Sequence, residues 1–221
     1  MAVGITAFTL YHATLLPGVD LGDTASFQVV AGSSVITPRD GYPLYFALGD
    51  LLLGATGMEP ARALNLASAL EAAAACALVV WVAAELAGSL PAAVAAALLF
   101  AGSYTFWSQA IIAEVYALHI LFVALTIGLV LRWGTQPSPG RLAAFFAAYA
   151  LGFGNHLSMV LLGPGFTLYL LTAAPGGWRT MVRPRIVALA ALCAVAGALQ
   201  YAWNLHALWL QPNPPASLVV A

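Results

Sequence analysis

The sequence contains no lysine, and only 7% of its 221 residues are charged. Soluble domains carry about 25% charged residues, so this chain has too few charged residues to form the surface of a soluble domain. Hydrophobic residues make up 62% of the chain, and its mean hydropathy is +0.93. The seven basic residues form no patch that could neutralise a nucleic-acid backbone. The composition therefore indicates a protein of the lipid bilayer and argues against a nucleic-acid partner.

Cysteine and metal-binding motifs are also scarce. The only cysteines, Cys76 and Cys193, lie inside apolar runs, where we expect small packing residues rather than a disulfide. The CxxC and HExxH spacings are absent, so spacing predicts no metal site. Dependence on a divalent metal stays open, because several acidic residues are predicted to share one face. The first residues lack the basic region and cleavage site of a signal peptide, so we expect a retained span.

Long apolar runs predict an all-α, multi-pass membrane protein. A helix that crosses the bilayer needs about 20 mostly apolar residues. The predicted spans form one transmembrane domain over 1–210: 2–16, 61–86, 90–107, 115–133, a hairpin of 141–153 and 156–172, and 186–210. A polar outer loop at 17–60 contains a shorter apolar helix at 44–56, which we expect at the membrane interface. Residues 211–221 form a tail.

The arginines decide how the 32 apolar residues 141–172 are arranged. Cytoplasmic loops are enriched in basic residues. If the N-terminus is cytoplasmic, two short helices meeting near Gly152, Gly154 and Asn155 place five of the seven arginines in the cytoplasm. Six of the eight acidic residues then lie on the outer side. The sequence therefore predicts a hairpin, a cytoplasmic N-terminus and a polar outer face.

Asp23 is the first candidate for chemistry on that face. It follows Gly22, which permits a tight turn, just after the first predicted span. Its carboxylate could act as a general base or organise a phosphate site. Alternatively, Asp23 caps a helix over 25–31, since Asp is favoured at that position.

Glu114 and His156 are further candidates. Glu114 lies beside Tyr116 at the outer mouth of the span 115–133, where a carboxylate is either functional or a first-turn residue favoured by the helix dipole. Asn155 and His156 lie at the hairpin apex, where a broken helix is tolerated only against protein or a water-filled cavity. His156 could bind a phosphate or a sugar hydroxyl, or it could be a buried histidine bonded to a backbone carbonyl.

The end of the polar loop supplies Arg39, Asp40 and Tyr42. Arginine suits bidentate recognition of phosphate. An ion pair of Arg39 with Asp40 or Asp23 would explain this arginine equally well. Taken alone, these features do not separate an enzyme from a transporter.

Five blocks of sequence, taken together and in order, resemble a known family. They are Tyr11–Phe27 (YHATLLPGVDLGDTASF), Gly41–Tyr45, Asn65–Ala69, Phe106–Gln109 with Glu114–Leu118, and Gly154–Leu157. In this order they resemble the N-terminal part of the transmembrane-protein-260 type of protein O-mannosyltransferase, a family with bacterial and animal members.

The resemblance implies a GT-C glycosyltransferase in a bacterial inner membrane. The donor would be a polyprenyl-phosphate sugar, mannose by analogy, and the acceptor a protein or glycan hydroxyl. Asp23 falls at the position of the catalytic acidic residue in the first outer loop. The residues expected to bind substrate are Arg39, Asp40, Tyr42, Glu114, Tyr116, Asn155 and His156.

Two departures from the family pattern leave alternatives. Ser26 stands where the family usually has Glu, and Pro38-Arg39-Asp40 stands where it usually has His-Pro-Pro. A non-catalytic relative that binds lipid-linked sugar, or a transporter of such lipids, would also use a polar outer cavity.

Overall fold

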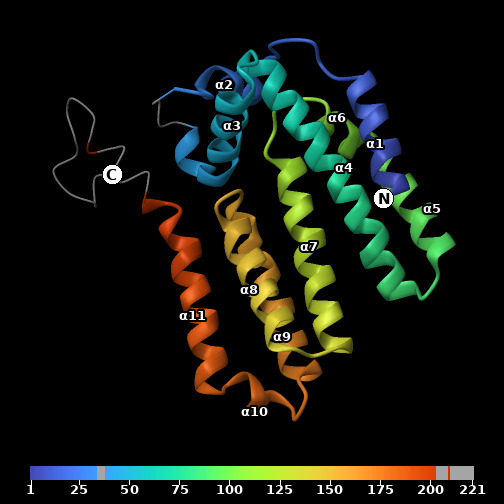
Figure 1. Ribbon diagram of the computed structural model, residues 1–221, viewed down its shortest axis with the longest axis vertical. Helices are drawn as coiled ribbons and strands as arrows, with labels where there is room; N and C mark the ends of the chain where they lie inside the picture. The colour runs from blue at the N-terminus through green and yellow to red at the C-terminus, as the bar shows by residue number, and fades with distance from the viewer. Residues whose placement is uncertain (34–37, 203–208, 210–221) are drawn as a thin grey trace.

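The computed structural model describes residues 1–33, 38–202 and 209, and it is helical without any strand in these residues (Figure 1). The all-α prediction is therefore confirmed. The elements are α1 (Ala2–Ala13), α2 (Asp23–Val30), η1 (Arg39–Gly41), α3 (Pro43–Thr56), α4 (Pro60–Ala87), α5 (Leu90–Ala101), α6 (Tyr104–Ala110), α7 (Tyr116–Thr135), α8 (Pro139–Phe153), η2 (Leu157–Leu162), α9 (Gly163–Ala173), α10 (Trp178–Met181) and α11 (Pro184–Leu199).

Helix α4 lies at the centre of one half of the molecule and contacts α1, α5 and α7. Within the described residues, α4 and α7 are long and apolar enough to cross a membrane, and α5 with α6 would make a third span if the pair is counted as one. Helices α1, α8 and α11 are shorter than a full span. The predicted span 186–210 is described as α11 only as far as Leu199, and most of its last residues lie outside the described part. The helices are therefore those of a protein with two or three candidate spans.

The predicted span 90–107 is not one continuous helix. Helix α5 ends at Ala101, and α6 begins at Tyr104 with its axis turned by 67°. The Ser103 hydroxyl donates to the Phe100 carbonyl over 2.7 Å, so it bonds a carbonyl at the end of α5. The ring of Phe106 then folds back to 4.2 Å from that of Phe100. Hydropathy alone predicted a straight helix here because the break uses only two small residues.

The chain reverses direction at the apex of the predicted hairpin, whose place within a membrane stays a prediction. Helix α8 ends at Phe153, and the chain continues through η2 into α9, where the Phe166 ring lies 5.1 Å from that of Phe145 in α8 (Figure 1). The Leu44 amide at the start of α3 donates to the Gly154 carbonyl over 2.8 Å. The apex is therefore fastened to the polar loop that precedes α4.

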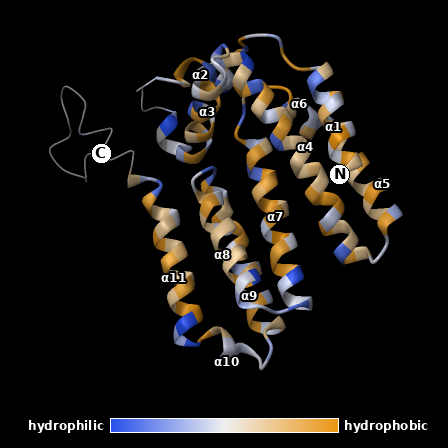
Figure 2. Cartoon of the chain, in the orientation of Figure 1, coloured by the Kyte–Doolittle hydropathy of each residue, from blue (hydrophilic) through white to orange (hydrophobic). Residues whose placement is uncertain are grey.

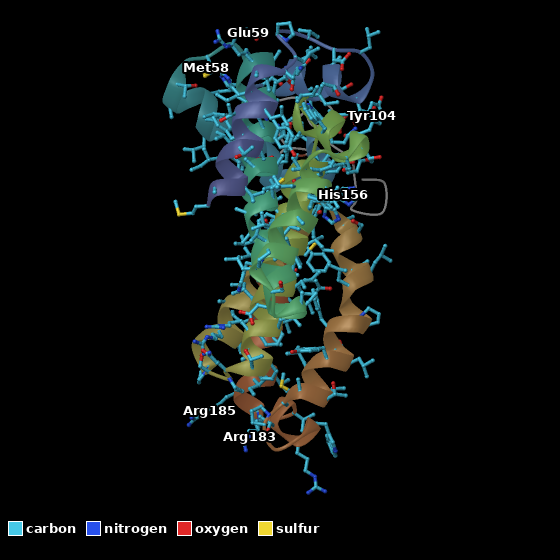
Figure 3. All side chains as sticks on the ribbon, turned by 90° about the vertical axis from the view of Figure 1, so that its right-hand side faces the viewer. Met58, Glu59, Tyr104, His156, Arg183 and Arg185 are labelled. Atoms are coloured by element: carbon cyan, nitrogen blue, oxygen red, sulfur yellow. The ribbon has the colours of Figure 1, made fainter. Side chains whose placement is uncertain are left out.

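Charges separate toward the two ends of the molecule. Hydrophobic residues predominate along the helices and polar ones gather near their ends (Figure 2). Glu59 lies at one end and Arg183 and Arg185 at the other, while His156 lies toward the Glu59 end (Figure 3). This arrangement agrees with the arginine pattern of the sequence. The side that faces the cytoplasm stays a prediction.

Candidate functional site

The candidate site begins at the first turn of α2. Gly22 is the N-cap of this helix with a φ of 69°, a left-handed conformation that glycine adopts without strain. Asp23 is the first helical residue and makes no side-chain capping bond. The interpretation of Asp23 as the cap of a helix over 25–31 is therefore wrong, because the helix already begins at Asp23 and the preceding residue, Gly22, is its N-cap.

The carboxylate of Asp23 is available to a ligand. The side chain is exposed and has no hydrogen-bond or ion-pair partner within the part of the chain that the structure describes. It lines a cavity of about 630 Å³, whose wall also includes Ser26, Phe27, Pro38 and Tyr42. The N-terminus of a helix favours a negative charge, so α2 presents an anionic proton acceptor to this cavity.

Glu114 lies behind Asp23 and is only 9% exposed. Its Oε1 accepts a hydrogen bond from the Thr24 hydroxyl over 3.0 Å, and its backbone N–H donates to Ser68 Oγ over 3.4 Å. Burial raises the pKa of the Glu114 carboxyl, the nearby charge of Asp23 raises it further, and the bond from Thr24 opposes the shift. Helix α7 has Val115 as its N-cap, so Glu114 is not a first-turn residue of that helix.

A buried amide pair holds α2 against α4. Gln28 Nε2 donates to Asn65 Oδ1 over 2.9 Å, and Asn65 Nδ2 donates to the Leu16 carbonyl over 2.9 Å. Both amide side chains are buried. Buried polar groups of this kind are costly unless they are paired, so the pair fixes α2 in one position. No role for Gln28 or Asn65 was predicted from the sequence. A signal for Asn65 is present, because Asn65 and Ser68 are polar residues one turn apart in an apolar helix.

His156 lies in a cluster of rings that reaches the Asp23 cavity. Its ring centroid is 5.9 Å from that of Tyr42, 6.0 Å from that of Tyr116 and 4.9 Å from that of His119. Tyr42 also lines the cavity of Asp23. The structure therefore brings Asp23, Tyr42, Tyr116 and His156 into one region. The position of His119 beside His156 was not predicted from the sequence.

The protonation of His156 follows from its own contact. Its Nδ1 accepts a hydrogen bond from the Ser158 backbone N–H over 3.2 Å and so caps η2. A neutral imidazole with an accepting Nδ1 carries its proton on Nε2. His156 therefore offers an N–H donor at Nε2. The alternative from the sequence was a hydrogen bond to a backbone carbonyl, whereas Nδ1 accepts from a backbone N–H. The hydroxyl of Ser158 lies 3.1 Å from His119 Nε2, which joins the two imidazoles.

Asn155 lies beneath this cluster and is fully buried. Its Nδ2 donates to the Val115 carbonyl over 3.1 Å, which fastens the hairpin apex to the start of α7. Its Oδ1 is buried without a partner among the described residues. Binding of substrate by Asn155 stays a prediction, and the contacts give it a positioning role.

Arg39 already has acceptors for both Nη atoms. Its Nη1 lies 2.6 Å from Asp50 Oδ2 and its Nη2 lies 3.2 Å from Asp50 Oδ1. Nη2 also donates to the Ser33 carbonyl over 2.9 Å, and the guanidinium lies 5.0 Å from the centre of the Phe46 ring. The sequence did not suggest this ion pair with Asp50, and Arg39 makes none with Asp23 among the described residues. Phosphate binding by Arg39 stays a prediction, and the side chain of Asp40 lies outside the described part.

No metal site is assigned. Residues 1–33, 38–202 and 209 contain no group of three or more His, Cys, Asp or Glu side chains that could hold a metal ion. Hard divalent cations take about six or more oxygen ligands, and the neighbouring carboxyls of Asp23 and Glu114 do not make such a set.

Comparison with known proteins adds one finding. A family model described as the "Protein O-mannosyl-transferase TMEM260 N-terminal domain" matches residues 23–179, which is more than half of the chain. The match begins at Asp23 and includes Glu114 and His156. No curated protein and no solved structure matches the chain.

Proposed function

Because the chain belongs to the protein O-mannosyl-transferase TMEM260 N-terminal domain family, we propose that it transfers a sugar from a polyprenyl-phosphate donor to an acceptor hydroxyl. The sugar would be mannose, in line with the family name, and the acceptor a protein or a glycan. The proposed setting is a GT-C fold in a bacterial inner membrane with its site outside. The observation that carries the proposal is the exposed carboxylate of Asp23, which has no partner among the described residues and lies on the wall of a cavity of about 630 Å³.

The proposed reaction is an inverting transfer. Asp23 takes the proton of the acceptor hydroxyl as the acceptor oxygen bonds to the anomeric carbon. The bond from that carbon to the phosphate oxygen breaks at the same time, and its electron pair leaves with the lipid phosphate. Attack from the face opposite the phosphate inverts the configuration at the sugar carbon.

The ring cluster is the proposed binding place for the departing phosphate. The Nε2 proton of His156 and the hydroxyls of Tyr42 and Tyr116 are donors that would stabilise negative charge as it develops on the phosphate. Glu114 is proposed as a positioning residue, since its bond to Thr24 holds the turn of α2 that carries Asp23. Tyr42 joins the two halves of the site, because it lines the Asp23 cavity and its ring lies 5.9 Å from that of His156.

A transfer assay tests this proposal. The purified chain is reconstituted in lipid and given radiolabelled polyprenyl-phosphate mannose with a mixture of acceptors. The native chain should transfer label, and Asp23→Asn should lower the rate by about 10²–10⁴-fold, the usual contribution of a general base. Asp20→Asn is the matched control, because Asp20 lies in the same loop and its Oδ1 accepts a bond from the adjacent Leu21 N–H. Equal transfer by all three proteins would rule out the assigned role of Asp23.

A second candidate function is binding of lipid-linked sugar without transfer. The observation that favours it is Ser26, which lines the Asp23 cavity at the position where the resembling sequences usually carry Glu. The native chain would then bind the donor but transfer nothing. Ser26→Glu should in that case gain measurable transfer, whereas under the first proposal the native chain transfers without it.

A further inference from the structure

A second cavity lies at the end of the molecule opposite Asp23, where the chain passes from α10 into α11. Its volume is about 790 Å³. Trp133 and Leu142 form a buried part of its wall, Ile186 and Leu189 of α11 form another, and Arg183 and Arg185 lie at its edge. Figure 3 shows the two arginines at this end, far from Glu59. We propose that this cavity binds the phosphate headgroup of an acidic phospholipid.

The second half of the chain carries an excess of positive charge. The sequence contains no Asp or Glu after Glu114, whereas five of its seven arginines follow that residue. Arg132 is paired with Glu85 over 3.0 Å, and Arg141 Nη1 donates to the Gln136 carbonyl over 2.6 Å.

Arg183 and Arg185 differ from these two arginines and from Arg179, whose guanidinium lies 5.8 Å from the centre of the Trp178 ring. Both are exposed, and neither side chain has an ion pair or hydrogen bond within the described ranges. Among the described residues, no acidic side chain lines the cavity. Two unneutralised guanidinium groups beside a cavity therefore create a local positive field that a phosphate would offset.

The apolar wall indicates a lipid rather than a free anion. On the side of α11 that carries Leu189, Leu192 and Leu199 follow, and their side chains are exposed in the isolated chain. A headgroup bound at the arginines would place its acyl chains along this apolar face. The arginine fork binds two phosphate oxygens at once, and basic pockets between membrane helices bind acidic lipid headgroups. A free phosphate would contact the arginines but not the apolar wall of the cavity.

Lipid binding by the purified chain tests the inference. The chain is held in nanodiscs of phosphatidylcholine, phosphatidylglycerol is added in steps, and retained lipid is counted by native mass spectrometry after gentle release. The native chain should retain phosphatidylglycerol in preference to phosphatidylcholine. Arg183→Gln and Arg185→Gln should each weaken this retention about fivefold, the usual contribution of one basic residue near an anionic surface.

Arg62→Gln is the matched control, since Arg62 is an exposed arginine near the start of α4 at the opposite end. It should retain phosphatidylglycerol as the native chain does. Equal retention of the two lipids by the native chain would overturn the inference. Unchanged retention by a variant that carries both Arg183→Gln and Arg185→Gln would also overturn it. Displacement of the lipid by inorganic phosphate at equal concentration would overturn it in favour of a free-anion site. The comparison of lipids on the native chain needs no variant, so a folding defect cannot hide the answer.

Discussion

At the scale of single residues, two neighbouring carboxyl groups have very different surroundings. Asp23 is exposed on a cavity wall, and Glu114 is buried behind it and bonded to Thr24. The charge of Asp23 is one of the causes that raise the pKa of Glu114. The two carboxyls therefore have separate roles in the proposal, with Asp23 as base and Glu114 as a positioning residue.

Glu114 should make stability depend on pH. Its pKa in the folded chain is raised above the value of about 4.3 for an unfolded glutamic acid. The folded state therefore binds the proton more tightly, and stability falls as the pH rises from about 4.3 through the folded pKa, then levels off. Glu114→Gln keeps an acceptor for Thr24 and should remove this fall. The melting temperature in detergent from pH 4 to 8 measures it, and an unchanged slope in the variant would contradict the assignment.

His156 should have two separable roles. Its Nδ1 caps η2 and its Nε2 is the proposed donor to the phosphate. His156→Asn can keep a capping acceptor, whereas His156→Ala cannot, so only the alanine variant should lose stability, by about 1 kcal/mol. Both variants should transfer sugar more slowly. Unfolding curves and transfer rates are compared side by side, and full transfer by His156→Asn would exclude the donor role.

The sequence predicted single polar residues better than their partners. Glu114 and His156 are conspicuous because they interrupt apolar runs, and Asp23 because it follows Gly22 just after the first predicted span. The pairing of Arg39 with Asp50 was not predicted, because it joins residues on either side of a turn whose path the sequence does not reveal. The partners considered instead were Asp40, which is the sequence neighbour of Arg39, and Asp23.

At the scale of elements, the ion pair of Arg39 and Asp50 ties the segment after α2 to α3. Asp50 Oδ1 also accepts the Gly32 N–H over 2.9 Å. Asp50→Asn would leave Arg39, which is 6% exposed, without its counter-ion. Losing one partner of a buried pair costs about 3–5 kcal/mol, and the lower end is expected because the Asp50 side chain is 37% exposed.

Equilibrium unfolding measures the cost of breaking this ion pair. The matched control is Asp20→Asn, which removes a loop carboxylate that has no ion pair within the described residues. An Asp50→Asn variant as stable as the control would show that the pair does not hold the loop.

Helix boundaries were predicted where the sequence carries a physical break. Glycines at 152 and 154 with Asn155 indicated the hairpin, and Gly57 and Gly88 end α3 and α4 in the left-handed conformation. The turn between α5 and α6 was missed, because Gly102 and Ser103 lie inside an apolar stretch and hydropathy does not register them. The helix pattern therefore followed from composition, while the bend depended on how Phe100 and Phe106 pack.

At the scale of the whole molecule, the charges predict an orientation. Glu59 lies at the end that carries Asp23, and Val182 lies beside the arginines at the other end. Basic residues favour the cytoplasmic side. In a chain without its native cysteines, Glu59→Cys should react with an impermeant maleimide in intact cells, and Val182→Cys only after the membrane is opened. The opposite pattern would invert the proposed topology and place the Asp23 cavity inside.

The central claim is that Asp23 acts in the chemical step of sugar transfer. The most direct measurement is the single-turnover transfer rate of native chain and Asp23→Asn at saturating donor, with the donor dissociation constant of each. The transfer rate of Asp23→Asn should be about 10²–10⁴-fold lower than that of the native chain. The donor dissociation constants of the two proteins should agree within about twofold, because a general base acts on the acceptor proton. An unchanged rate, or a rate that recovers once donor saturates the variant, would contradict it.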